Sequence, residues 1–158
     1  MIYLTKKQLR EIVEQCRGEY PKEACGILAG RRIQGIKDDE LCGRYEPASA
    51  GEQDGKVSKI YKMANISENP EVCYFMDPKE QLRVFKEMRR LGVEMLGIYH
   101  SHTASPAYPS ARDCEMAFYP EAAYVIVSLQ TFNDPTVRAF RIVEGEIKEI
   151  KIEVAEDE

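Results

Sequence analysis

Apolar residues occur along the chain in short runs that predict a set of buried strands. Runs of about four to eight apolar residues, bounded by glycine, proline or charged residues, are typical of such strands. The segment 123–129 (Ala-Tyr-Val-Ile-Val-Ser-Leu) has the strongest strand character, and we expect it to lie centrally in a sheet. Further strands are predicted at 24–29, 60–66, 72–76, 95–99, 137–143 and 147–154, with a weaker candidate at 36–45.

Two longer segments combine helical periodicity with helix start signals. In residues 5–17, Thr5 and Gln8 are spaced for a capping box, and apolar residues repeat every three or four positions. The second helix is predicted to begin after Asp77, with Pro78 in its first position, and to end at Gly92. Its core-facing stripe is expected to consist of Leu82, Phe85, Met88 and Leu91.

The order of these elements predicts one mixed sheet with helices packed on it, an α/β (α+β mixed) fold. The last two strands flank Glu144, Gly145 and Glu146, a turn that is typical of a hairpin. Residues 46–59 are polar with two glycines, and we expect a mobile loop there. No repeat or domain boundary is evident, so we expect a single domain at 1–154 and an acidic tail at 155–158.

The composition excludes several classes of function. The 158 residues are 44% hydrophobic and 31% charged, as in an ordinary globular domain. A net charge of −5 without a basic run argues against a nucleic-acid partner. No segment reaches the roughly 18 apolar residues of a membrane span, and the first residues lack the order of a signal peptide. The five scattered cysteines contain no Cys-x-x-Cys pair, which favours reduced thiols and a cytoplasmic location.

Candidate chemistry is concentrated in residues 99–113. The two histidines of the chain, His100 and His102, follow an apolar run and lie two residues apart, so in a strand their side chains share one face. A proline-containing loop leads to Ser110, a predicted helix start that places Asp113 in the first turn. Two imidazoles and one carboxylate with an open fourth position are typical of a catalytic zinc site.

Simpler interpretations exist for each part of this pattern. The histidines could lie at a solvent-exposed strand edge, and Ser110 with Asp113 matches a capping box in form. Taken singly, these interpretations are the better ones, because short motifs match by chance. The joint pattern favours a metal site, because the chain has its only histidines at one strand end that faces an acidic helix start.

The spacing His-x-His, seven residues, Ser, two residues, Asp resembles the JAMM motif of the MPN+ (JAB1/MPN/Mov34-type) metallopeptidases. The motif falls on His100, His102, Ser110 and Asp113, and Glu23 stands where the family carries an upstream glutamate. The resemblance covers nearly the whole chain and is closest to short bacterial and archaeal members. It implies a curved mixed sheet, topologically akin to the cytidine deaminases, although the deaminase signature itself is absent.

The resemblance also implies a function. The three metal ligands would hold one Zn²⁺ whose bound water is the nucleophile, Glu23 would act as general acid and base, and Ser110 would donate a hydrogen bond to the developing oxyanion. Family members cut next to the C-terminal glycine of ubiquitin-like proteins, and bacterial relatives trim small sulfur-carrier proteins. We therefore expect a peptidase or isopeptidase that acts on the C-terminal tail of such a protein.

Two other functions compete with this one. A non-catalytic MPN scaffold that binds partner proteins is disfavoured, because such members have typically lost the metal ligands. A cysteine hydrolase using Cys25 with His102 is disfavoured, because Cys25 lies in a predicted buried strand without a feature that lowers a thiol pKa. Cys114 is interpreted as a small buried hydrophobic residue, Arg112 as part of a solvated helix face, and Tyr99 is expected to point away from the metal.

Overall fold

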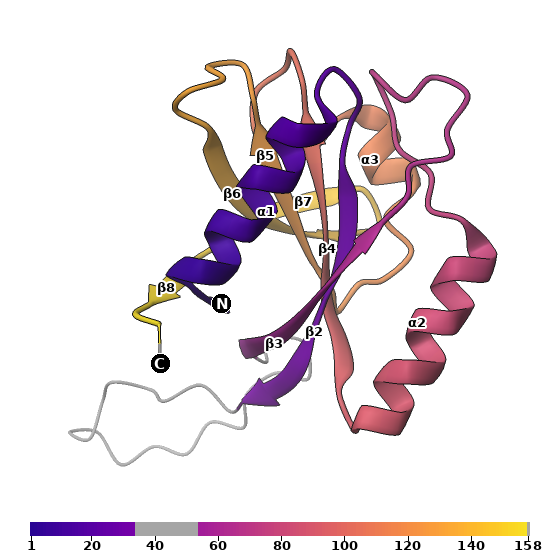
Figure 1. Cartoon of the computed structure of the whole chain (residues 1–158), viewed down its shortest axis with the longest axis vertical. Helices are drawn as coiled ribbons and strands as arrows, with labels where there is room; N and C mark the ends of the chain where they lie inside the picture. The colour runs from indigo at the N-terminus through magenta and orange to yellow at the C-terminus, as the bar shows by residue number, and fades with distance from the viewer. Residues whose placement is uncertain (34–53, 158) are drawn as a thin grey trace.

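A computed structural model describes residues 1–33 and 54–157, which form one eight-stranded mixed sheet and three helices (Figure 1). The elements follow one another as β1 (Ile2–Thr5), α1 (Lys6–Glu19), β2 (Cys25–Ile33), β3 (Asp54–Met63), α2 (Pro78–Leu91), β4 (Glu94–His102), α3 (Ala111–Glu115), β5 (Ala123–Ser128), β6 (Thr136–Val143), β7 (Glu146–Ile150) and β8 (Ile152–Ala155). The predicted mixed α/β architecture is confirmed.

The strand order of the sheet is β7-β6-β5-β4-β2-β3-β1-β8, so β4 and β2 occupy its middle. These two strands are antiparallel to each other, whereas β4 and β5 run parallel. The strand β5 is fully buried, as its apolar sequence predicts, but it lies one place to the side of the central pair. The sheet is curved (Figure 1).

Each face of the sheet carries its own hydrophobic core. The helix α1 lies across one face and buries Ile12 and Cys16 against residues of β1, β4 and β5. The helix α2 packs against the other face through Val84 and Met88. Because side chains alternate along a strand, β4 contributes Tyr99 to the first core and Ile98 to the second. The histidines of β4 follow Ile98 at the same spacing and share its face.

The helix starts are formed as predicted. Thr5 caps α1 in a complete capping box with Gln8. Asp77 caps α2 by accepting a hydrogen bond from the backbone of Lys79 (2.9 Å), and Gly92 ends this helix at a φ of 66°, a conformation that glycine adopts without strain. The predicted stripe on α2 was partly wrong, because Leu82 and Leu91 are 56% and 41% exposed. Leu82 is about 200° around the helix from Val84, and Leu91 lies in the last turn.

Several predicted strands differ in extent or pairing. The prediction of a loop at 46–59 was wrong for residues 54–59, which belong to β3 and alternate inward Val57 with outward Lys56 and Ser58. Residues 46–53 and the candidate strand at 36–45 lie outside the described residues. The predicted strand at 60–66 ends at Met63, and of the predicted strand at 72–76 only Met76 forms a bridge, which pairs it with Asn65.

The predicted C-terminal hairpin is present, with Glu144 and Gly145 in its turn, both at positive φ. The segment predicted as a strand at 147–154 is divided, because its second half forms β8 and pairs in parallel with β1. Past β8, Asp157 of the predicted acidic tail accepts a hydrogen bond from the backbone N–H of Lys7 (2.7 Å). A carboxylate is stabilising at that position, because the first turn of α1 has unpaired N–H groups.

None of the helices within 1–33 and 54–157 has the length and apolar character required to cross a lipid bilayer.

Gly26 of β2 leaves space for the ring of Tyr99 on the neighbouring strand β4, and its replacement by alanine is expected to destabilise the fold. A Cβ atom at this position would lie 2.2 Å from the ring of Tyr99, which is fully buried and has no room to move. We expect a loss of about 1–3 kcal/mol in the free energy of unfolding. The matched control is Gly18→Ala, because nothing lies within 4 Å of the added Cβ in α1. Chemical denaturation of both variants checks this, and equal stabilities would contradict it.

Candidate metal centre

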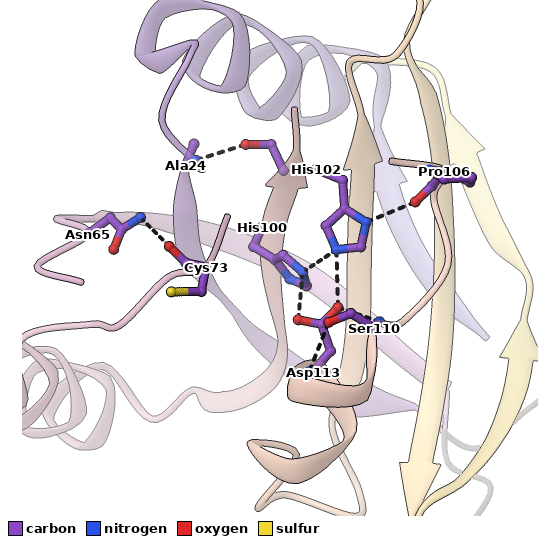
Figure 2. Close-up of polar contacts among 9 residues, drawn as sticks. Ala24, Asn65, Cys73, His100, His102, Pro106, Ser110 and Asp113 are labelled. Carbon is purple, nitrogen blue, oxygen red and sulfur yellow. Dashed lines mark hydrogen bonds and ion pairs between the residues drawn. The ribbon is translucent and has the colours of Figure 1, made fainter. Parts of the chain in front are cut away.

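The two histidines are adjacent side chains on one face of β4 at its C-terminal end. They are 1% and 5% exposed, and their Nε2 atoms lie 3.0 Å apart (Figure 2). His102 Nδ1 bonds the carbonyl oxygen of Pro106 at 2.8 Å, so Nδ1 carries the proton, because a carbonyl only accepts. The Nε2 atom of His102 is therefore left with a free lone pair directed toward His100.

Asp113 is brought to the histidines by the first turn of α3. Its Oδ1 lies 3.2 Å from His100 Nε2 and its Oδ2 lies 3.1 Å from His102 Nε2. The same Oδ2 accepts a hydrogen bond from the backbone of Ser110 (2.8 Å), while Ser110 Oγ accepts one from the backbone of Asp113 (3.1 Å). The capping box predicted from the sequence is therefore present, and it orients the carboxylate toward the imidazoles (Figure 2).

Glu23 lies two residues before Cys25, which pairs with His100 across β2 and β4. One donor atom from each of Glu23, His100 and His102 lies within 4.8 Å of the other two. The Glu23 side chain is 4% exposed, and its Oε2 has no hydrogen-bond partner among the described residues. Glu23 and the two histidines thus form one buried cluster, which the partly buried Asp113 joins through its contacts with the histidines, although Glu23 is 77 residues before His100 in the chain.

The cluster is chemically suited to a metal ion. Lone pairs from two imidazole nitrogens and a carboxylate converge on one point, and such a set is stabilised only by a proton or a cation. Zinc accepts nitrogen and carboxylate oxygen in the same site. The buried Nδ1 of His100 has no hydrogen-bond partner in the described part of the chain, whereas ligand histidines usually donate from their second nitrogen. His100 is instead covered by the ring of Tyr74, stacked at a centroid distance of 4.5 Å.

Burial and the local charges shift the pKa of each group in the cluster. Burial raises the pKa of Glu23 to about 7, and the nearby His102 works in the opposite direction. Burial lowers the pKa of His100 and keeps its imidazole neutral. Burial also works to lower the pKa of His102, but its contacts with Asp113 and with the Pro106 carbonyl outweigh burial and raise that pKa. Burial also works to raise the pKa of Asp113, but its contacts with His100 and His102 outweigh burial and hold the pKa below its usual range. Metals are ligated by neutral imidazoles and ionised carboxylates, so the shifts at His100 and Asp113 favour ligation, whereas a bound cation would take the place of a proton at His102.

The cluster lies at one side of a cleft of about 230 Å³. Ser110 is exposed on its wall, with a hydroxyl that is within reach of a molecule bound in the cleft. Thr103 Oγ1 donates to the backbone carbonyl of Glu71 (3.1 Å) and so ties two wall segments together. The lining residues are Glu23, Glu71, Val72, His102, Thr103, Ala104, Ser105 and Ser110.

The other candidate side chains lie away from the cluster or are unsuited to chemistry. Cys25 is fully buried, and burial raises the pKa of its thiol to about 12. Tyr99 points into the opposite core, as predicted, and donates from its hydroxyl to Gln15. Arg112 is exposed and Cys114 is half-buried. Sequence reasoning missed Tyr74 and the Pro106 carbonyl, because loops bring both to the histidines and no local pattern marks such contacts.

Comparison with known proteins identifies the family. Residues 5–143 match the model of Prok-JAB, described as prokaryotic homologs of the JAB domain. The chain therefore belongs to the Prok-JAB family. The resemblance inferred from the sequence motif is thus confirmed.

Named relatives of this Prok-JAB domain are peptidases. A CysO-cysteine peptidase from Mycobacterium tuberculosis is 33% identical over 145 residues, which cover 92% of this chain and 85% of the relative. A probable TtuB-protein conjugate cleaving protease from Thermus thermophilus is 31% identical over 146 residues, covering 92% and 79%.

Solved structures have the same fold. The solution structure of a protein from Desulfitobacterium hafniense has a TM-score of 0.80 at 38% identity and covers 99% of this chain and 94% of its own. The crystal structure of a JAB1/MPN domain protein from Archaeoglobus fulgidus has a TM-score of 0.56 at 15% identity and covers 98% of both chains. This Prok-JAB domain thus has the fold of JAB1/MPN domain proteins.

Proposed function

We propose that this Prok-JAB domain is a zinc-dependent peptidase that hydrolyses an amide bond at the C-terminus of a ubiquitin-like or sulfur-carrier protein. The observation that carries the proposal is the convergence of the buried Glu23, His100 and His102 with the partly buried Asp113 beside a cleft. The names of the relatives support the substrate class, since they describe peptidases that act on CysO-cysteine and on TtuB–protein conjugates.

In the proposed site, His100, His102 and Asp113 would hold the metal. When bound, zinc supplies a Lewis acid for the substrate carbonyl and a water of lowered pKa near neutral pH. The protein residues fix the ligand geometry: the Pro106 carbonyl holds the tautomer of His102, and the Ser110 N–H holds one oxygen of Asp113. Three protein ligands would leave a fourth position for water or substrate, as a catalytic site requires, and Glu23 and His102 line the adjacent cleft.

Glu23 is proposed as the general acid and base. Amide hydrolysis requires a group that takes a proton from the attacking water and delivers it to the leaving nitrogen. The Glu23 carboxylate lines the cleft next to His102, and its Oε2 has no hydrogen-bond partner in the described part of the protein. A buried carboxylate without partners has a raised proton affinity, which suits both halves of this transfer.

Ser110 is proposed to donate a hydrogen bond to the oxygen of the substrate carbonyl as negative charge develops on it. Its Oγ accepts from the backbone of Asp113, and a hydroxyl that accepts one hydrogen bond retains its own proton for donation. Its exposure on the cleft wall makes that proton accessible to substrate. Such donors contribute about 10²–10³-fold in rate.

Removal of the metal is expected to abolish cleavage, whereas thiol alkylation is expected to leave it intact. The assay uses small ubiquitin-like carriers whose C-terminal glycine is extended by one amino acid or joined to a lysine, with products identified by mass spectrometry. A chelator should stop the reaction and added zinc should restore it. Iodoacetamide should not modify Cys25, because that thiol is fully buried and its pKa is raised to about 12.

The opposite pattern, inactivation by iodoacetamide and indifference to chelator, would replace this proposal with a cysteine hydrolase. Peptide mapping of the alkylated protein serves as the control, because it shows which of the five cysteines has reacted; among the described residues, Cys73 and Cys114 are half-buried.

A further inference from the structure

Glu23 is held by contacts that the sheet does not supply. The ladder between β2 and β4 begins at Cys25, so the backbone of Glu23 has no strand partner. Its N–H donates to the carbonyl of Pro70 (2.7 Å), and its carbonyl accepts from the side-chain amide of Asn65 (2.9 Å). The direction of the Glu23 carboxylate therefore depends on residues 65–70, because both backbone groups of Glu23 are fixed there.

Asn65 uses both ends of its side chain. Its Nδ2 also lies 3.1 Å from the Cys73 carbonyl (Figure 2) and 3.4 Å from that of Pro70. Its Oδ1 accepts from the backbone N–H groups of Ser67 (3.0 Å) and Phe75 (3.1 Å). The half-buried side chain of Asn65 thus joins the segment before β2 to both ends of the loop that follows it, residues 66–75. Backbone N–H and C=O groups away from water need hydrogen-bond partners. A side-chain amide that bonds several of them therefore restricts their relative movement.

The loop at 66–75 that Asn65 closes also contacts the proposed ligands. Its neck is formed by the bridge between Asn65 and Met76 and by the bond from Ile66 N–H to the Phe75 carbonyl (2.8 Å). The loop carries Tyr74, whose ring stacks on His100 with an interplanar angle of 28°. The same loop therefore contacts the proposed base on one side and a proposed metal ligand on the other.

We propose that Asn65 is a positioning residue that sets the place of Glu23 relative to the histidines. The donor half of the amide holds the Glu23 carbonyl, and the acceptor half holds the shape of the loop. This inference rests on the proposed function, in which Glu23 transfers the proton. A proton-transfer group displaced by about 1 Å loses much of its effect, whereas substrate binding in the cleft is retained.

Asn65→Asp tests the donor half, because it keeps Oδ1 and replaces the donating NH₂ by an oxygen that repels the three carbonyls. We expect kcat to fall about 10- to 100-fold, with KM changed less than about threefold and zinc content unchanged. Asn69→Asp is the matched control, since it adds the same charge in the same loop at an exposed side chain that makes no hydrogen bond among the described residues. We expect this control to retain wild-type kcat.

Asn65→Ser distinguishes the loss of positioning from the effect of an added charge. Serine is too short to make the contacts of the amide, and it introduces no carboxylate. The proposal requires a fall in kcat for this variant also. A fall in Asn65→Asp alone would assign the effect to charge and overturn the proposal. Equal kcat values for both Asn65 variants and the Asn69→Asp control would overturn it as well.

Amide hydrogen exchange measured by NMR supplies a readout that needs no substrate. We expect the Glu23 amide to exchange about tenfold faster in both Asn65 variants than in Asn69→Asp or the wild type, because its bond to Pro70 opens more often. Unchanged exchange would show that Asn65 does not hold Glu23. If the wild type cleaves no carrier, the proposed function fails, and the exchange rates still decide whether Asn65 fixes this segment.

Discussion

Glu23→Gln is expected to lower kcat by about 10²–10⁴-fold, the usual contribution of a general acid and base. Glutamine has nearly the same shape but cannot take up a proton at neutral pH, so only the transfer step is lost. Zinc content is expected to stay at the wild-type level, because His100, His102 and Asp113 remain. Steady-state kinetics with an extended carrier protein, alongside elemental analysis, measure both quantities.

The same substitution is expected to preserve or raise thermal stability. The buried Oε2 of Glu23 has no hydrogen-bond partner within the described residues, and an unpaired buried carboxylate destabilises a fold. A neutral amide removes that penalty, so activity and stability should change in opposite directions. Glu68→Gln, at an exposed position, controls for the loss of one negative charge. A Glu23→Gln enzyme with near wild-type kcat would remove Glu23 from the mechanism.

His100→Ala combined with His102→Ala is expected to abolish both zinc binding and cleavage. Wild-type protein should carry about one zinc per chain, and the double variant should carry almost none, since two of the three proposed ligands are gone. Elemental analysis of protein purified without a histidine tag gives the content directly, because the chain contains no other histidine.

The third proposed ligand is tested by Asp113→Asn, and Asp134→Asn is the matched control for that variant. Asp134 is exposed in the turn after β5, whereas Asp113 bonds both imidazoles, so only Asp113→Asn should lose zinc. A wild-type protein that takes up no zinc when supplied with it would contradict the metal centre and favour a binding scaffold.

The elements that could be predicted from sequence are those whose signals are local. Thr5 with Gln8, Asp77 before Pro78, and Ser110 with Asp113 all act within one helical turn, and each cap forms as expected. The two histidines share a face because strand geometry fixes the direction of residues two apart. These signals suffice to place His100, His102 and Asp113 together in one site.

Features that depend on distant partners could not be predicted in the same way. The strand β1 has only four residues, and it forms because β3 and β8 pair with it from distant parts of the chain. The start of β3 has a polar sequence, but Asp54 is buried beside the N-terminal amino group (2.8 Å) and Val57 enters the core. Tertiary contacts of this kind override composition.

In the candidate site, the proposed metal ligands could be predicted from local signals, whereas Glu23 could not. Nothing in the sequence around Glu23 distinguishes it from an ordinary surface glutamate, and the family resemblance alone nominated it. Its burial follows from long-range contacts, namely the pairing of β2 with β4 two residues later and the hydrogen bonds of its backbone to Asn65 and Pro70. Asn65 and Tyr74 lie on a connecting segment, where side-chain roles are set by the fold rather than by periodicity.

The capping box of α3 has a consequence for thermodynamic linkage. Oδ2 of Asp113 serves the Ser110 N–H and His102 at once, so the helix start and the ligand set share one atom. The cap holds Asp113 in the orientation that an ion would need. A bound ion would therefore stabilise the cap by the same free energy by which the cap favours ion binding. Substitutions in the exposed segment before α3 should therefore tune metal affinity without touching a ligand. That gives this short helix an influence on the site that its five residues would not suggest.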